Sequence, residues 1–281
     1  MSAAKFPRGL GVLVGGESCV GLIAGIGQAV DAGYRTVQLN LTHHHFTEEE
    51  IREIAAAVRQ NDLEVAAVGV YCDLLRPESD HFFGTSVDRD LVPMIPLCRE
   101  LGANSLIAWT GSLAEGLLDE HPQNQTEASR ASLRRTLDRL RPLLKEHGVK
   151  LLFEPWHTHV LGGAEDMAAE ILRDPAAFAA VVDLPNFLRG RKEFDRREEI
   201  LPRLVDTLIP IADIVHLKDI AYSPEGEMQL PGAGKGALDY PEILRMLSPL
   251  WERVPYVIEH VDAPDFASTG AFVLGAMVRG A

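Results

Sequence analysis

The chain has 281 residues, of which 46% are hydrophobic and 24% are charged, so it can build a large core. Its 41 acidic and 27 basic residues give a formal net charge of −14, which repels phosphate backbones and anionic membrane surfaces. No stretch approaches the roughly 18 apolar residues of a spanning helix, and the first residues do not resemble a signal peptide. We therefore expect a cytoplasmic protein without nucleic-acid or membrane partners.

Short runs rich in β-branched residues alternate with segments of helical period along the chain, a pattern typical of βα units and a parallel sheet. The expected strands are 9–14, 36–39, 64–70, 105–109, 150–153, 178–182, 211–215 and 256–258. The expected helices are 20–32, 47–61, 87–101, 126–147, 164–173, 196–208, 240–250 and 265–278. Thr47, ahead of three glutamates, favours a helix start, and Gly148 favours a helix end.

Eight strand–helix pairs in a chain of 281 residues predict an α/β fold, a (β/α)8 TIM barrel that forms one domain over residues 1–281. An open doubly wound sheet is the alternative. The absence of a GxGxxG after the first strand, and of a linker rich in Pro, Gly or Ser, favours the barrel. The long connections 71–86, 110–125 and 218–239 each follow a strand, so they are expected to cover a site at the carboxyl ends, with surface decoration as the alternative.

Each of the last four strands is closed by a residue that can bind a metal. They are Glu154, Asp183, His216 and Glu259. Singly, each has an ordinary explanation as a cap, an ion-pair partner or a core histidine. Together they would converge at the mouth of a barrel, where three carboxylates repel one another unless a cation lies between them. The pattern therefore predicts a metal site.

The ligand types limit which metal and which substrate this site suits. Carboxylates and an imidazole favour Mn²⁺, Mg²⁺ or Co²⁺, with Zn²⁺ as a further option, and the three cysteines form no CxxC pair. An octahedral ion with four protein ligands keeps about two open positions, enough for adjacent oxygens of a polyol or hydroxyketone. We therefore expect a small-molecule sugar or keto-polyol substrate.

Two further motifs accompany the strand ends. They are Val215–Asp219 (Val-His-Leu-Lys-Asp) and Pro231–Gly236 (Pro-Gly-Ala-Gly-Lys-Gly). With the four strand ends, they resemble the xylose isomerase-like sugar phosphate isomerase/epimerase superfamily, and the resemblance spans nearly the whole chain. It implies a divalent-metal barrel, often with Mn²⁺, and relatives that are commonly dimers or tetramers.

The resemblance also implies roles for individual residues. Glu154 and Glu259 would be both metal ligands and the acid/base pair, and Asp183 and His216 would complete the metal shell. A metal bound to a carbonyl and the neighbouring hydroxyl acidifies the C–H between them and stabilises an enediolate. One glutamate would remove the proton and the other return it, which gives an isomerase or epimerase.

The chain departs from the ketose 3-epimerases of this group at three positions. Those enzymes usually carry a histidine after the aspartate and an arginine after the histidine ligand, whereas this chain has Asn186 and Lys218. Gln38 occupies the second strand, where many relatives have a glutamate. These changes count against a 3-epimerase and leave the metal site intact, and we expect Asn186 and Lys218 to contact the substrate.

Three loop or strand-end residues are further candidates for substrate contact. His157 lies in a loop restricted by Pro155 and Trp156, and a solvated loop is the alternative. Trp109 closes the fourth strand and would form an apolar wall, unless it only packs at the rim. Adjacent residues point in different directions, so at most one or two of residues 43–45 face the mouth, and His45 is the candidate.

Three other functions fit parts of the pattern. The same enolate could expel a β-leaving group, as in an inosose-type dehydratase or a lyase of oxidised glycosides. An endonuclease IV-like nuclease would need more ligands on earlier strands and a basic face, and the net charge of −14 argues against it. A sugar-binding barrel with a structural ion is the non-catalytic alternative.

Overall fold

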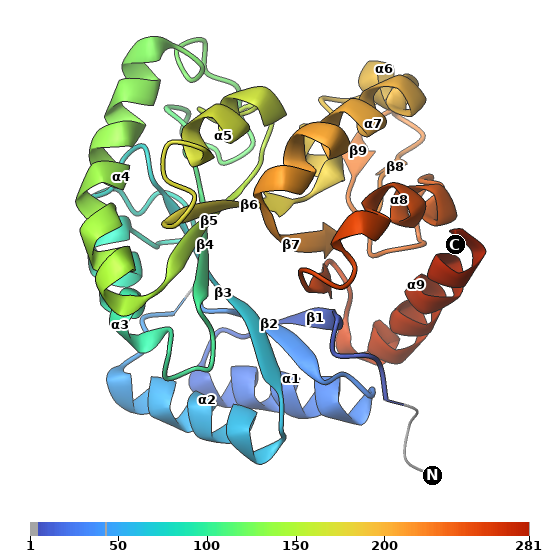
Figure 1. Ribbon diagram of the computed structural model, residues 1–281, viewed down its shortest axis with the longest axis horizontal. Helices are drawn as coiled ribbons and strands as arrows, with labels where there is room; N and C mark the ends of the chain where they lie inside the picture. Colours follow the sequence, from blue (N-terminus) through green and yellow to red (C-terminus); the bar gives the residue numbers. More distant parts are fainter. Residues whose placement is uncertain (1–4, 43, 281) are drawn as a thin grey trace.

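The computed structural model describes residues 5–42 and 44–280. Within them, eight parallel strands close into a barrel in the order β1-β10-β7-β6-β5-β4-β3-β2, which confirms the predicted (β/α)8 fold. The barrel strands are β1 (Leu10–Gly15), β2 (Thr36–Asn40), β3 (Glu64–Asp73), β4 (Ser105–Trp109), β5 (Lys150–Glu154), β6 (Phe178–Val182), β7 (Ala212–Leu217) and β10 (Tyr256–Ile258). Figure 1 shows them at the centre of the molecule, with the helices outside.

The helices lie around the barrel and follow its strands in the chain. They are α1 (Cys19–Asp31), α2 (Glu48–Gln60), α3 (Val92–Leu97), α4 (Glu127–His147), α5 (Ala164–Ile171), α6 (Arg191–Phe194), α7 (Arg197–Leu208), α8 (Tyr240–Leu247) and α9 (Phe266–Gly280). The predicted signals appear at two of them. Thr47 caps α2 in a reciprocal capping box with Glu50, and Gly148 ends α4 in the left-handed conformation, with φ of 61°.

Alternate residues of each strand point to opposite sides, so the core has two parts. A large outer cluster fills the space between the strands and the helices. A small inner cluster fills the barrel with side chains from six strands, namely Ala67, Tyr71, Ile107, Leu152, Ala179, Val181, Ile214 and Val257. The inner cluster fixes which residues of each strand point toward the barrel axis.

The predicted helix 87–101 is wrong in its extent. Val87–Leu91 form a π-helical turn, α3 covers only Val92–Leu97, and turns follow up to residue 102. Pro93 is tolerated in the first turn of α3, but Pro96 lies inside the helix and has no N–H for the ladder. Two prolines so close together restrict α3 to a short segment.

The three long connections all leave the carboxyl ends of barrel strands, from β3, β4 and β7. The connection after β7 contains an antiparallel hairpin of β8 (Ala221–Tyr222) and β9 (Met228–Gln229), two strands that are not among the predicted ones. No helix in the described part of the chain combines the length and the apolar character needed to cross a bilayer.

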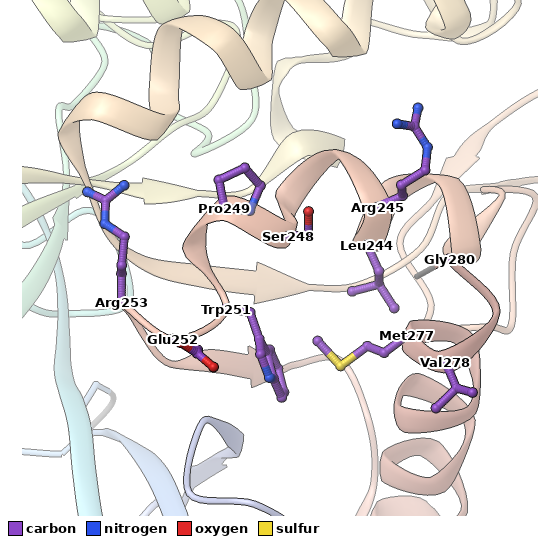
Figure 2. Close-up of a pocket in the computed structure, with 10 residues that line it drawn as sticks. All are labelled: Leu244, Arg245, Ser248, Pro249, Trp251, Glu252, Arg253, Met277, Val278 and Gly280. Carbon is purple, nitrogen blue, oxygen red and sulfur yellow. The ribbon is translucent and has the colours of Figure 1, made fainter.

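A cavity of about 820 Å³ lies away from these carboxyl ends. Figure 2 shows its walls, which are α8 and the turn after it on one side and the end of α9 on the other. Trp251 and Met277 are among its lining residues. The turn that contains Trp251 leads into the amino end of β10, so this cavity belongs to the face opposite the predicted site.

Candidate metal centre

Every second residue of a barrel strand points inward, and this places the four predicted ligands at the inside of the barrel mouth. Leu152, Val181, Ile214 and Val257 belong to the inner cluster. Two residues further along the same strands, and therefore on the same inward side, lie the proposed ligands, which are Glu154, Asp183, His216 and Glu259. Each is at most 4% exposed. We call these four residues the metal cluster.

Distances within the metal cluster are short. The Nδ1 atom of His216 lies 3.4 Å from Glu154 Oε2, 3.4 Å from Glu259 Oε2 and 3.9 Å from Asp183 Oδ2. One ligand atom from each of the four residues lies within 4.8 Å of the others. The three distances from His216 Nδ1 lie below about 4.2 Å, the limit for two ligand atoms that are each about 2.1 Å from one centre. The widest separation of 4.8 Å exceeds this limit, so the side chains would move slightly closer together around such an ion.

The hydrogen bonds of the metal cluster leave three buried atoms unsatisfied. Glu154 Oε2, Asp183 Oδ1 and His216 Nδ1 have no hydrogen-bond partner. Such atoms are costly to bury unless a ligand or ion satisfies them. Two carboxylates and an imidazole nitrogen aimed at one point therefore fit a divalent cation with a preference for oxygen and nitrogen ligands.

Lys218 follows the end of β7, two residues after His216, and its ammonium group enters the metal cluster. The Nζ atom donates to Asp183 Oδ2 and to Glu259 Oε1, at 2.6 Å in each case. The lysine therefore uses one oxygen of each carboxylate, while Asp183 Oδ1 remains without a partner. A cation and Lys218 can share these two carboxylates through different oxygens.

Burial and charge together set the protonation of this group of residues. Burial raises the pKa of Asp183 well above its usual range, against the opposing charge of Lys218. Burial also acts on Glu259, but there the charge of Lys218 outweighs it and lowers the pKa. The carboxylates of Asp183 and Glu259 in turn raise the pKa of Lys218 against its own burial, so the lysine carries its charge.

Gln38, which departs from the glutamate of many relatives, is also a part of the site. Its Oε1 atom lies 2.8 Å from His216 Nε2, and its Nε2 donates to the hydroxyl of Tyr71 at 3.1 Å. An amide oxygen accepts, so His216 carries its proton on Nε2 and turns an unprotonated Nδ1 to the metal cluster. The inward alternation of β2 was the available signal for Gln38.

Two of the predicted substrate-contact residues lie directly beside the metal cluster. Asn186 donates from Nδ2 to Asp183 Oδ2 at 2.7 Å and to Glu154 Oε1 at 3.5 Å. The backbone N–H of His157 donates to the carbonyl of Asn186 at 3.1 Å. Burial lowers the pKa of the His157 imidazole, so this ring is neutral at pH 7.

The other two candidates differ in their distance from the metal cluster. Trp109 is half-buried, pairs in register with Glu154 across β4 and β5, and packs against Tyr71 with ring centroids 5.2 Å apart. His45 is exposed, and its Nδ1 lies 2.6 Å from Asp90 Oδ1, so the structure does not bring it to the metal cluster. Residue 43 lies outside the described residues.

Fold and site together define a (β/α)8 barrel with a buried carboxylate–histidine cluster that can bind a divalent metal at the carboxyl ends of its strands. The family model described as "Xylose isomerase-like TIM barrel" matches residues 26–271. The chain belongs to this family. A search of curated proteins found no match.

Solved structures agree with this fold at low sequence identity. A xylose isomerase-like TIM barrel protein from Mycobacterium smegmatis in complex with magnesium has a TM-score of 0.66 and 14% identity, covering 94% of this chain and 90% of that one. A 3-keto-D-glucoside 4-epimerase from E. coli has a TM-score of 0.67 and 14% identity, covering 95% and 98%. A probable 3-DHS dehydratase from Bacillus anthracis has a TM-score of 0.68 and 12% identity, covering 94% and 98%. The neighbours thus include both epimerases and a dehydratase.

Proposed function

We propose that the protein is a divalent-metal-dependent sugar isomerase or epimerase that acts on a ketose or keto-polyol. The observation that carries the proposal is the buried metal cluster, in which two glutamates from β5 and β10 lie at equal distances from one histidine nitrogen. A divalent ion held there would polarise a substrate carbonyl and acidify the neighbouring C–H.

Proton transfer is the task of Glu154 and Glu259. Their strands lie on either side of β6 and β7 in the barrel, so the two carboxylates reach the substrate from different sides. One carboxylate removes the C–H proton, and the other returns a proton to the opposite face of the same carbon or to the adjacent carbon. The first outcome is an epimerisation and the second is an isomerisation, both through an enediolate.

Neighbouring side chains support this transfer. Burial, together with the charges of Glu154 and Glu259, raises the pKa of Tyr71 far above its usual range, so its phenol stays neutral and can donate a hydrogen bond. Lys218 keeps Glu259 ionised, and its ammonium is positioned to contact a substrate oxygen. Asn186 and His157 border the same space, and Trp109 offers an apolar surface to a sugar ring.

Mn²⁺ is the proposed metal, with Mg²⁺, Co²⁺ and Zn²⁺ as the options that the ligand set also accepts. The magnesium in the complex with the Mycobacterium smegmatis protein supports a divalent ion of this class. The proposed location is the cytoplasm, which the three unpaired, buried cysteines support, because a reducing compartment keeps thiols free.

The test is solvent deuterium incorporation by the metal-loaded protein. Ketoses and keto-inositols are incubated with the Mn²⁺ protein in D₂O, and the products are analysed by NMR and mass spectrometry. An isomerase or epimerase places deuterium at a carbon of the retained sugar skeleton. Loss of water or of an aglycone would instead support the lyase alternative, which the dehydratase neighbour favours.

Glu154→Gln and Glu259→Gln complete this experiment. Each variant keeps an oxygen ligand but no longer has a carboxylate that accepts a proton. We expect the exchange to fall by about 10²-fold or more, the scale of general acid–base catalysis, while metal content stays near one ion per chain. Unchanged exchange in either variant would contradict the assigned role. The absence of both exchange and elimination in the wild type would favour the sugar-binding barrel.

A further inference from the structure

Tyr71, near the end of β3, has a ring whose place is fixed by close packing. It belongs to the inner cluster of the barrel and is 5% exposed. The ring folds back along the strand over Gly69, where a Cβ atom would lie only 2.8 Å from Tyr71 Cε2. The ring also packs against Trp109, and the backbone N–H of Tyr71 donates to Thr42 Oγ1 at 3.2 Å. These contacts hold the hydroxyl at one point inside the barrel mouth.

A chain of hydrogen bonds passes through this hydroxyl and joins two members of the metal cluster. His216 Nε2 donates to Gln38 Oε1 at 2.8 Å, and Gln38 Nε2 donates to the hydroxyl oxygen of Tyr71 at 3.1 Å. Because that oxygen accepts from Gln38, the hydroxyl hydrogen is left to donate, and the Glu154 carboxylate accepts it in a side-chain hydrogen bond. All three bonds point from His216 toward Glu154, and hydrogen bonds aligned in this way strengthen one another.

The two glutamates of the metal cluster are held by different kinds of donor. Glu259 Oε1 accepts from the Lys218 ammonium at 2.6 Å. Among the described residues, the side-chain hydrogen bonds to Glu154 come from uncharged groups, the Tyr71 hydroxyl and the Asn186 amide. Tyr71 interacts with Glu259 through charge alone. An uncharged donor fixes the orientation of a carboxylate without pairing it to an opposite charge, so the Tyr71 hydroxyl is specific to Glu154.

Orientation matters for Glu154 because its carboxylate has two proposed tasks. Its Oε2 atom is buried without a hydrogen-bond partner and lies 3.4 Å from His216 Nδ1, where an ion would bind. The same carboxylate must also accept a proton from the substrate, and such transfers depend on closely aligned atoms. A carboxylate without other restraints can rotate about its last bond and lose this alignment. The hydrogen bond from Tyr71 opposes that rotation.

We propose that Tyr71 is a positioning residue for Glu154, and that its hydroxyl holds the carboxylate in the orientation that accepts the substrate proton. The proposal rests on the proposed function and deepens it, because it assigns Tyr71 to one of the two bases. In the step itself, the substrate C–H bond breaks and an O–H bond forms on Glu154. Tyr71 keeps its own proton throughout, and Gln38 holds the hydroxyl oxygen in place.

The test measures deuterium uptake from D₂O into four D-ketohexoses, namely fructose, psicose, sorbose and tagatose. NMR follows the sugar that exchanges fastest with the wild type. Each variant is saturated with Mn²⁺ according to its own dissociation constant, which calorimetry measures. Tyr71→Phe is expected to lower kcat by about tenfold or more, the scale of one charge-assisted hydrogen bond, and to leave KM within about twofold.

Two glutamate variants show which base depends on Tyr71. In Glu259→Gln the residual exchange relies on Glu154, and the added Tyr71→Phe change is expected to slow it by about tenfold or more. In Glu154→Gln the residual exchange relies on Glu259, and the added change is expected to alter it by less than about threefold. Equal slowing in both backgrounds would overturn the proposal, since Tyr71 would then support the site as a whole.

Tyr34→Phe is the matched control. Tyr34 is also buried and donates its hydroxyl to the carbonyl of Phe266 at 2.9 Å, but it lies in the outer cluster ahead of β2. This variant loses a buried hydrogen bond and is expected to keep the exchange rate of the wild type. A loss of exchange equal to that of Tyr71→Phe would overturn the proposal.

Urea unfolding of the metal-free protein tests the hydrogen bond without any enzyme activity. Tyr71→Phe is expected to lower the unfolding midpoint less in a Glu154→Leu background than in the wild type, because the acceptor is already absent there. Equal shifts in the two backgrounds would show that the hydroxyl does not act on Glu154, and they would overturn the proposal.

The results also separate this proposal from the proposed function. Exchange at the same rate in the wild type and in Tyr71→Phe removes the positioning role and keeps the isomerase or epimerase. A wild type that exchanges no C–H of any of the four sugars, with coupling between Tyr71 and Glu154 in the unfolding experiment, keeps the hydrogen bond and removes the catalytic role of both residues.

Discussion

Removal of the Gln38 side-chain oxygen is expected to weaken metal binding without a change in any ligand. Gln38 Oε1 accepts from His216 Nε2 at 2.8 Å inside the barrel, where no water replaces it easily. Gln38→Leu leaves the buried Nε2–H of His216 without an acceptor, which costs about 1–3 kcal/mol of folding free energy. It also frees the histidine to carry its proton on Nδ1, the atom that faces the metal cluster. Loss of such an outer partner typically lowers metal affinity by about 10–100-fold.

Titration calorimetry measures the Mn²⁺ affinity of each variant, and thermal unfolding measures the stability of the metal-free protein. Gln38→Glu keeps an acceptor oxygen and is expected to hold its affinity within a few-fold of the wild type. Gln60→Leu, an exposed change at the end of α2, controls for a general effect of the added leucine. If Gln38→Leu bound Mn²⁺ as tightly as Gln60→Leu, the proposed control of the His216 tautomer would be wrong.

Three further predictions follow from the charges and burial of the site. Lys218→Met removes a cation from Asp183 and Glu259, so calorimetry should show Mn²⁺ affinity rising by about tenfold or more; weaker binding would contradict the shared-carboxylate arrangement. Because burial raises the pKa of Asp183, a metal ion must displace a proton, and metal affinity should fall by up to about tenfold for each pH unit that the pH is lowered. Titrations in buffers of different ionisation enthalpy should detect the released proton, and the absence of proton release would refute this prediction. Burial lowers the pKa of His159 from 6.5 to about 4, so the unfolded chain takes up a proton first as the pH falls, and up to about 3 kcal/mol of stability should be lost between these values. Urea unfolding at several pH values measures this loss, and an equal pH slope in His159→Phe would show that another group causes it.

The barrel and the convergence of Glu154, Asp183, His216 and Glu259 could be predicted from the sequence, because both depend on short-range periodicity. Glu154 and Glu259 each end an apolar strand two residues after an inward side chain, and the closed sheet then brings distant strands together. Pro93 and Pro96 show the limit of such patterns. The apolar residues keep a helical period across both prolines, but the backbone cannot continue as a regular helix there.

The remaining features depend on contacts that no local pattern contains. Gln38 and His216 are 178 residues apart, and their hydrogen bond exists only after the barrel closes. Lys218 was predicted to contact substrate, and its side chain also donates to Asp183 and Glu259, contacts that no strand pattern indicates. The loops after β4 and β5 are joined by hydrogen bonds such as that from Asn124 to the carbonyl of Thr158, which no periodicity indicates.

A single divalent ion is expected to bind among Glu154, Asp183, His216 and Glu259. Anomalous diffraction from a crystal grown with Mn²⁺ locates such an ion. We expect one strong peak about 2.1 Å from an oxygen of each carboxylate and from His216 Nδ1. A protein that takes up no Mn²⁺, or a peak elsewhere on the barrel, would contradict this expectation.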